Sequence, residues 1–469
     1  MMGFNMIAVQ SLANLSAKKV TTSLLLFCFC VLCFVWPIEN SNLPANRNLF
    51  IYLSLAMTLF LYFKKQGMPL AHNATSRMPI YILAGLLAFT LLNGLFVAPD
   101  LKQMFRSWQG QYLRAGLLFF IGLLIYSFSA SCFRGLSKTR FLSLVVLCSL
   151  GVIFIHVIQT AFMYLRNGYI DWGVTWIVRT RTEMSFQINF ICGILFAELL
   201  SRLFLHRKFL IFKTSLLLFF IAICFVATAL VNTRWGTIGL IGSTISICIF
   251  IAAKMLSRDN RKKMLLTGAA VALMVAAVGY ASWTQDPRWQ SLSQDAVSGW
   301  NLSVDNRCYD GFKGPTLQDS TGRVLDESNA CRSTFFHQGW KLVFENPFGT
   351  GPRKDAFLVL LQKAYHDPTI EQENSHYGVI DFALQNGFIG LVGWLCFVIS
   401  LIVVGWNAFS KKLIMPGLFL SLMAVSFLFR SSVDNMLRDH FLEQFMAFTG
   451  LMIGLIVTKD KNSVPGSAS

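Results

Sequence analysis

The sequence predicts an all-α polytopic membrane protein, and two observations carry that prediction. Of the 469 residues, 55% are hydrophobic and only 13% are charged, with a mean hydropathy of +0.56, whereas soluble domains carry about 25% charged residues. Apolar runs near the ~20 residues that a helix needs to cross a bilayer recur along the chain. This pattern excludes a soluble enzyme, a disordered protein and a protein that binds nucleic acid.

Each apolar run is expected to be a helix, because backbone amides in lipid must be paired within their own segment. Twelve runs are expected to span the membrane: residues 20–38, 48–63, 79–97, 111–130, 141–165, 184–204, 212–231, 236–256, 264–283, 376–407, 414–431 and 440–457. The first run lacks a small-residue cleavage site, so we expect it to be retained. The chain then divides into nine helices over 1–283, a large loop at 284–375, three helices over 376–457 and a disordered tail at 458–469.

Lysine and arginine decide the expected orientation, because the cytoplasmic connections of membrane proteins are enriched in both. One alternating set of connections holds 21 of the 40 Lys and Arg residues and the other set holds 10. We therefore expect both termini in the cytoplasm and the loop 284–375 outside. Most of the net charge of +17 then reports orientation. Several outward arginines could each extend to the interface, but as a set they suggest an anion-binding vestibule: Arg106, Arg114, Arg181, Arg234 and Arg430.

Two cysteines differ from the other nine in their surroundings. Nine of the eleven lie in or beside apolar runs, and only Cys308 and Cys331 lie in the loop expected to face an oxidising compartment. We expect them to form a disulfide, with two free thiols as the alternative. The bridge would close a ring of about 24 residues, stabilise the loop by roughly 3 kcal/mol, and hold the adjacent Arg332 in place.

The second half of the loop is predicted to form a helix over 332–346, because its apolar residues recur at helical spacing. Asn346-Pro347-Phe348-Gly349-Thr350-Gly351-Pro352 then ends it. His376 opens the tenth span, and Gly387 and Gly390 follow at offsets of eleven and fourteen. These offsets predict one shared helical face, with the glycines allowing close packing of a neighbour. A lone His at a helix end is also compatible with a purely structural role.

These motifs resemble a known family. His376 with Gly387-Phe388-Ile389-Gly390 looks like the His-x10-Gly-x-x-Gly signature of bacterial O-antigen ligases, much of which O-antigen polymerases share. Asn232-Thr233-Arg234-Trp235-Gly236 resembles that superfamily's Ser/Thr-Arg-Gly motif, with Trp inserted. Arg332 to Trp340, followed by Asn346 to Gly351, resembles its Arg…Trp…Asn-Pro-x-Gly-x-Gly stretch. The similarity covers about residues 230–400. Tyr377 departs from the Asn, Ser or Gln usual in ligases after the His.

The resemblance implies a GT-C-like glycosyltransferase in the bacterial inner membrane, with its active site facing the periplasm. It would transfer polysaccharide from undecaprenyl diphosphate to an outer-core sugar of lipid A-core. His376 is the expected general base, and Arg234 and Arg332 are expected to bind the diphosphate. Arg181, Arg179 and Arg353 are further donor-binding candidates. The chain lacks an Asp-x-Asp motif, so we expect inverting transfer with no metal and no other cofactor.

Two alternatives stay open. An O-antigen polymerase, which extends lipid-linked repeats, would need a similar vestibule and base. A lipid or glycan transporter is disfavoured, because the spans are expected to hold almost no charge except Glu198. Other charged groups have no assigned role at this stage. Asp434, Arg438 and Asp439 could pair together or line the donor site, His156 is expected to be a core residue, and Asp381 is not expected to orient His376.

Overall fold

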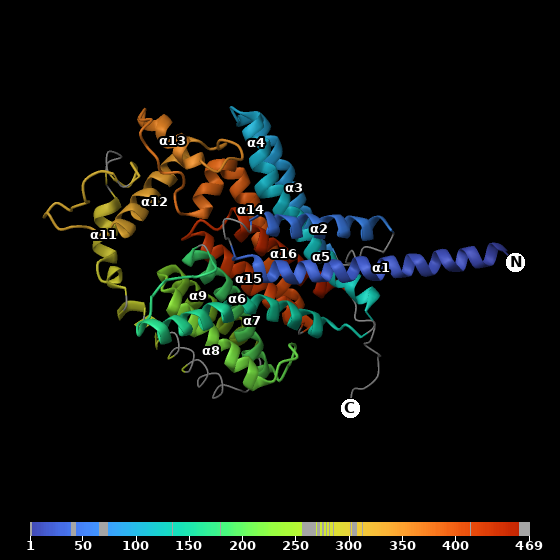
Figure 1. The fold of residues 1–469 in the computed structure, drawn as a ribbon. Helices are drawn as coiled ribbons and strands as arrows, with labels where there is room; N and C mark the ends of the chain where they lie inside the picture. Colours follow the sequence, from blue (N-terminus) through green and yellow to red (C-terminus); the bar gives the residue numbers. More distant parts are fainter. Residues whose placement is uncertain are drawn as a thin grey trace.

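The computed structural model describes residues 2–38, 44–64, 74–133, 135–178, 180–255, 286–300, 302, 307–311, 313–412 and 414–458, with isolated residues between 269 and 284. Within these residues all helices and strands assigned to the backbone are helices, joined by turns and loops, apart from one isolated β-bridge between Gln318 and Val324. Figure 1 shows most of the helices packed together, with the N-terminal part of the helix Met2–Val35 extending away from them and the described parts of the loop segment 284–375 at their opposite edge. The prediction of an all-α polytopic membrane protein is confirmed.

The bundle helices follow the predicted apolar runs closely. They are α1 (Met2–Val35), α2 (Pro44–Phe63), α3 (Ala74–Val97), α4 (Leu101–Trp108), which continues through a π-helical turn (Gln109–Leu113) into α5 (Arg114–Cys132), α6 (Lys138–Asn167), α7 (Arg181–Leu205), α8 (Thr214–Val231), α9 (Arg234–Met255), α14 (Gly378–Lys412), α15 (Met415–Ser431) and α16 (Asp439–Val457).

Among the described residues, eight helical segments are long and apolar enough to cross a membrane, and α2, α9 and α15 contain shorter apolar stretches. Together these account for eleven of the twelve predicted runs. The predicted run 264–283 lies mostly outside the described residues, as does nearly all of the tail 458–469. The total of twelve spans therefore stays a prediction.

The helices α5 and α16 pack closely along their length, and glycines make the close approach possible. A Cβ on Gly450 would lie 2.0 Å from the carbonyl oxygen of Phe119, and one on Gly454 would lie 2.4 Å from that of Leu123. Gly122 faces the backbone of Ala447 in the same way. Small residues at such spacing let helix backbones touch in a membrane. The helices α1 and α2 also pack on α5, and α15 packs on α16.

Buried charges also occur inside the spans. Glu443 on α16 is fully buried and pairs with Arg114 at the start of α5. Glu198 on α7 accepts hydrogen bonds from the side chain of Arg202 (2.8 Å) and from two backbone amides. Asp381 on α14 is likewise buried. The expectation that Glu198 is nearly the only charge in the spans is therefore wrong. Each carboxylate lies near a helix end and has at least one donor as a partner.

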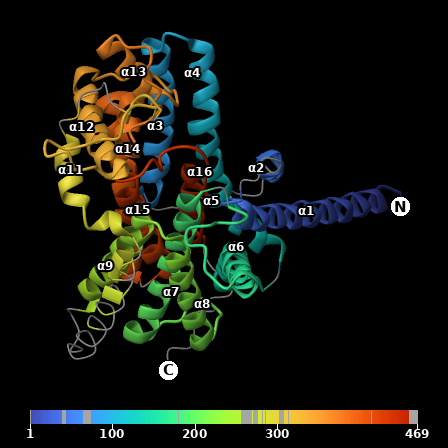
Figure 2. The ribbon, with the colours of Figure 1, turned by 60° about the vertical axis from the view of Figure 1, so that its left-hand side comes forward.

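The loop segment folds into short helices at one end of the bundle, here called the loop end. These are the 3-10 helix η2 (Pro287–Trp289), α11 (Leu292–Trp300), α12 (Glu327–Glu345) and α13 (Ala356–Tyr365). Figure 2 shows α11, α12 and α13 beside the ends of α3 and α14, with α8 at the opposite end of the bundle. The predicted helix 332–346 is present but begins five residues earlier, because the Asp326 side chain caps the amide of Asn329.

The loop segment has a small hydrophobic core of its own, which continues into α14. Phe335 and Phe357 of the loop helices pack together in this core, and Ala383 and Leu384 of α14 belong to the same cluster. The predicted disulfide is confirmed: Cys308 and Cys331 are bonded, with their Cα atoms 5.4 Å apart. The loop is thus attached rigidly to the helix that follows it.

Candidate active site

A cavity of about 160 Å³ opens where α7, α9, η2, α12 and α15 meet. We call it the arginine pocket, because five guanidinium groups line it: Arg181, Arg234, Arg288, Arg332 and Arg430. Its other lining residues are Thr182, Asn232, Thr233 and Ser328, so no carboxylate is among them. A cavity lined in this way favours an anion with several oxygen atoms.

Two of the arginines stand at the first position of a helix. Asn232 ends α8 in a left-handed conformation (φ 47°), and the Thr233 hydroxyl then accepts the amide of Gly236, so that α9 begins at Arg234. Thr180 caps α7 in a capping box with Glu183, and Arg181 follows. The positive ends of two helix dipoles therefore add to the side-chain charges.

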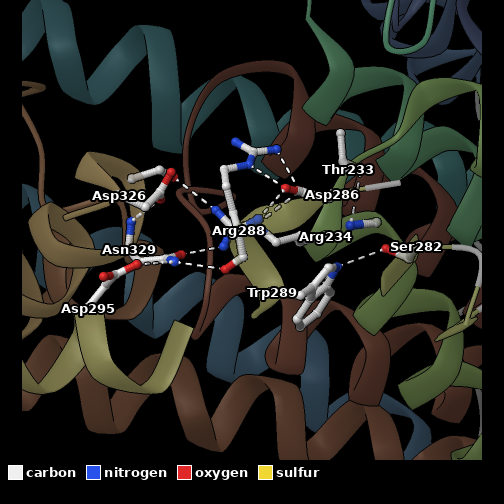
Figure 3. A network of polar contacts seen from close by, with 11 residues as sticks. Thr233, Arg234, Ser282, Asp286, Arg288, Trp289, Asp295, Asp326 and Asn329 are labelled. Carbon is white, nitrogen blue, oxygen red and sulfur yellow. Dashed lines mark hydrogen bonds and ion pairs between the residues drawn. The ribbon is translucent and has the colours of Figure 1, made fainter. Parts of the chain in front are cut away.

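Arg234 is held on several sides by residues of the loop segment (Figure 3). Its guanidinium donates hydrogen bonds to Asn329 and to the hydroxyl of Ser328 (3.1 Å), and it lies 3.5 Å from a carboxylate oxygen of Asp286. Asn329 itself donates to the carbonyl of Arg288 (2.9 Å). The prediction that Arg234 lies at the candidate site is supported by a second segment that orients it.

Asp286 and Arg288 form a fork-to-fork pair, with both nitrogen-to-oxygen distances at 2.7 Å. Burial raises the pKa of Asp286, but hydrogen bonds and charge from Arg288, with the charge of Arg234, lower the pKa below its ordinary value. Asp286 is therefore ionised and offsets part of the positive charge at the edge of the pocket.

Arg430, in the last turn of α15, is 1% exposed and incompletely hydrogen-bonded. Its Nη2 donates to the Ser185 hydroxyl (3.0 Å) and lies 3.6 Å from Asp434. Its Nε and Nη1 atoms have no hydrogen-bonding partner among the described residues. Buried donors without partners are costly, so a ligand with acceptor oxygens would stabilise this side chain.

His376 does not lie on the helix, which corrects the predicted shared face with Gly387 and Gly390. It precedes α14 by two residues in a left-handed conformation (φ 62°), and its amide donates to the side chain of Asn374 (3.1 Å). The face was predicted for an unbroken helix. A left-handed turn before Gly378 and a second one at Gly387 (φ 68°, ψ −175°) interrupt it.

The imidazole of His376 is partly buried and stacks on Phe335, with ring centroids 5.8 Å apart. Among the described residues, neither ring nitrogen has a hydrogen-bonding partner, so both are available to a substrate. The pKa of His376 is lowered to about 4, chiefly by burial and also by the charges of Arg332 and Arg438, while the charge of Asp434 acts in the opposite direction. In the unliganded protein the ring is neutral, as a general base must be.

Asp381 helps to place the backbone at His376, although the sequence did not predict that Asp381 orients this residue. Its carboxylate accepts the backbone amide of Ser375 (2.9 Å), the residue before His376. Because the chain turns sharply at His376, this contact acts on the backbone of the turn and not on the imidazole.

Gly387 allows the turn that follows α12 to pack directly against the backbone of α14. A Cβ at this position would lie 2.3 Å from the carbonyl oxygen of Pro347, and the Phe388 amide donates to that same oxygen (2.9 Å). Gly349, also left-handed (φ 74°), faces the α14 backbone from the other side. Gly390 lies against Phe89 of α3. Gly387 thus admits the backbone of a loop turn and Gly390 admits a side chain of α3, and neither shares a helical face with His376.

Other candidates lie elsewhere or were not foreseen. Arg353 pairs with Asp355 (2.9 Å at both nitrogens) and does not line the arginine pocket. Arg114 pairs with Glu443, and Arg106 is exposed on α4. Arg179 lies outside the described residues.

Sequence reasoning missed the pocket roles of Arg288, Asp286 and Asn329. No sequence signal marks Asn329. The Asp-Pro-Arg step at 286–288 begins a short helix and was the only available hint.

The fold and the site define a polytopic membrane protein with an arginine-lined pocket at its loop end and a histidine whose pKa is lowered in part by the charge of the pocket residue Arg332. Residues 216–395 match the family model described as O-antigen ligase. This match, which covers less than half of the chain, supports the resemblance of the motifs to the O-antigen ligase/polymerase superfamily, whose members are membrane glycosyltransferase-like enzymes. It includes Arg234, Arg288, Arg332 and His376, but not Arg181 or Arg430. No curated protein matches the chain.

Proposed function

We propose that this protein is an O-antigen ligase. It transfers a polysaccharide from undecaprenyl diphosphate to an outer-core sugar of lipid A-core, on the periplasmic side of the bacterial inner membrane. The observation that carries the proposal is the arginine pocket, with five guanidinium groups from four helices and η2. A diphosphate leaving group carries at least two negative charges, which such a pocket neutralises as the glycosidic bond breaks.

The chemistry follows from the two parts of the site. The hydroxyl of the acceptor sugar attacks the anomeric carbon of the donor and forms the new C–O bond. The bond between that carbon and the diphosphate oxygen breaks, and the electron pair leaves with the diphosphate into the arginine pocket. His376 takes the hydroxyl proton. A single direct displacement inverts the anomeric configuration.

Arg332 connects the two parts. It lines the pocket, and its charge also lowers the pKa of His376. A bound diphosphate would offset that charge, so donor binding raises the pKa of His376 and makes the imidazole a stronger base. The base would thus gain strength only when a donor is in place.

We propose that transfer needs no metal ion, with arginines supplying the positive charge. Among the described residues, no group of three or more His, Cys, Asp or Glu side chains could hold a metal. The test is transfer by the purified full-length protein, with undecaprenyl-diphosphate glycan and lipid A-core, in the presence of EDTA. Unchanged transfer supports the proposal, whereas complete loss that Mg²⁺ or Mn²⁺ restores contradicts it.

The same reaction mixture separates the ligase from a polymerase. A ligase produces polymer attached to lipid A-core, and its deletion leaves undecaprenyl-linked polymer accumulating in the cell. A polymerase instead lengthens the lipid-linked glycan without lipid A-core, and its deletion leaves single repeats attached to the core. If the purified protein lengthens the lipid-linked glycan without lipid A-core, the protein is a polymerase and the ligase proposal is wrong.

A further inference from the structure

A second, larger hollow lies on the loop segment, outside the arginine pocket. It has a volume of about 560 Å³ and opens between α11 and the turn at 317–325. This size lies within the roughly 300–1,000 Å³ of small-molecule sites. We propose that this hollow is a saccharide-binding subsite that holds part of the glycan chain during transfer, an inference that rests on the proposed function.

The lining has the chemistry that recognises a sugar without net charge. Hydroxyl and amide groups come from Ser293, Gln294, Ser298 and Thr321, and all of these groups can both donate and accept hydrogen bonds. Val297, whose side chain is 75% exposed, gives the hollow an apolar wall. Vicinal hydroxyls and the C–H face of a pyranose fit these two kinds of surface.

The two charged lining residues neutralise each other. The Arg323 Nε donates to Asp319 (3.0 Å), and Asp319 also accepts the hydroxyl of Thr321 (2.6 Å). The hydrogen bonds lower the pKa of Asp319 far below its ordinary value, so the pair stays ionised. The arginine pocket presents uncompensated positive charge, whereas this hollow does not. The two sites therefore suit different parts of one substrate: the diphosphate and the glycan.

A continuous chain of hydrogen bonds joins the hollow to the arginine pocket. Arg323 donates to Asp295 (3.0 Å), a fully buried carboxylate on α11. Asp295 accepts from Asn329 (3.2 Å), and Asn329 accepts from Arg234. Figure 3 shows Asp295 and Asn329 beside Arg234. Because three hydrogen bonds separate Arg323 from Arg234, a glycan that leaves the diphosphate site can reach the hollow within a few sugar residues.

The test removes the polar lining and narrows the hollow with the double variant Gln294→Leu/Ser298→Leu. Its matched control, Thr316→Leu/Gln318→Leu, changes exposed polar residues that lie outside the hollow. For a long-chain donor we expect the double variant to raise KM roughly tenfold at unchanged kcat, as expected for one or two lost hydrogen bonds. For a single-repeat donor we expect no change, because that donor does not reach the hollow.

A binding measurement keeps the subsite and the proposed function apart. The probe is O-polysaccharide released from its lipid by mild acid, titrated against the full-length protein in nanodiscs. We expect the wild type and the control to bind it and the double variant to lose binding. If this holds while the wild type transfers nothing, the subsite stands and the ligase proposal fails. Equal KM and equal binding in the double variant would overturn the subsite.

The single variant Gln294→Leu serves if the double variant does not fold, as judged by its melting temperature. Gln294 is exposed, so its replacement leaves the fold intact and should give the same loss to a smaller degree. Wild-type affinity for the polysaccharide and wild-type KM for the long-chain donor, in a folded Gln294→Leu protein, contradict the proposal.

Discussion

Arg234 at the first position of α9 donates a hydrogen bond to Asn329 in the first turn of α12, 95 residues away. The bond joins the transmembrane bundle to the loop segment at the wall of the arginine pocket. Asn329 is 4% exposed and also bonds Asp295 and the carbonyl of Arg288. The Asn329 amide thus bonds to two of the five pocket arginines, to the side chain of Arg234 and to the backbone carbonyl of Arg288.

Replacing Asn329 by Leu should therefore loosen Arg234 without removing its charge. We expect a loss of about 1–3 kcal/mol in the stability of the loop segment, because buried groups lose their partners. Glycosyl transfer should fall mainly through kcat, since Arg234 is no longer aligned with the leaving group. Asn329→Gln, which keeps the amide, should recover part of the activity. Normal transfer by a folded Asn329→Leu protein would show that Arg234 needs no such support.

The arginines of the pocket should differ in importance from an arginine outside it. Arg234→Gln and Arg332→Gln should each lower kcat by on the order of 10²–10³, as the removal of a charge-stabilising donor does. Arg353→Gln is the matched control, because Arg353 pairs with Asp355 and does not line the pocket. Its transfer rate should stay close to that of the wild type. An equal defect in all three variants would assign the loss to folding and not to the pocket.

His376→Ala should lower transfer about 10²–10⁴-fold while the protein level and melting temperature persist. The pH profile gives a second measurement. With a pKa of about 4, the free protein keeps its base neutral above about pH 5, so kcat/KM should fall only at lower pH. The acid limb of kcat, which reports the donor complex, should lie at higher pH because the diphosphate offsets the charge of Arg332. Coincident limbs, or limbs in the reverse order, would contradict this coupling.

Gly387→Ala should destabilise the protein by about 1–3 kcal/mol, because Gly387 is left-handed and a Cβ would meet the Pro347 carbonyl at 2.3 Å. The measurement is thermal unfolding in detergent. Gly85→Ala on α3 is the control, since a Cβ there has no atom within 4 Å and Ala is the better helix former. A Gly387→Ala protein as stable as the wild type would mean that the turn at 347–349 is not seated as described.

Replacing Cys308 and Cys331 together by Ser should lower the stability of the loop segment by roughly 3 kcal/mol. Transfer should fall more than expression, because Arg332 follows Cys331 directly and loses its anchor. Limited proteolysis of the folded protein within the loop measures the first effect. Unchanged protease resistance and unchanged transfer would contradict a role of the disulfide in placing Arg332.

The bundle was predictable from the sequence because each span must satisfy its own backbone, so apolar length alone marks it. The start of α9 at Arg234 was equally predictable, because Asn-Thr-Arg is a local stop and start signal. Arg181, Arg234 and Arg332 were chosen on charge and position, and all three line one cavity.

Nonlocal features were not predictable in this way. No glycine or proline at His376 signals its left-handed conformation. Because of this conformation, the prediction that His376, Gly387 and Gly390 share one helical face is wrong. Arg288 pairs with Asp286 two residues away, but its place in the pocket depends on residues of α7, α9, α12 and α15 that are distant in sequence. Asn329 acts through three partners distant in sequence. Periodicity describes one element at a time, whereas these contacts arise between elements.

The pair of Arg114 and Glu443 has a consequence for how the protein is made. Arg114 is synthesised more than 300 residues before Glu443. Before that, its guanidinium can bond the amide oxygen of Asn48 (3.3 Å), but that group does not neutralise its charge, and a charged Arg at the centre of a helix costs about 2.5–3.5 kcal/mol at the translocon. Stable insertion of the π-helical turn and α5 therefore requires α16. Until α16 is synthesised, α5 stays beside the translocon or Arg114 extends to the membrane surface. Truncation before α16 should leave α5 poorly inserted, so the last helix of the chain completes the insertion of an early one.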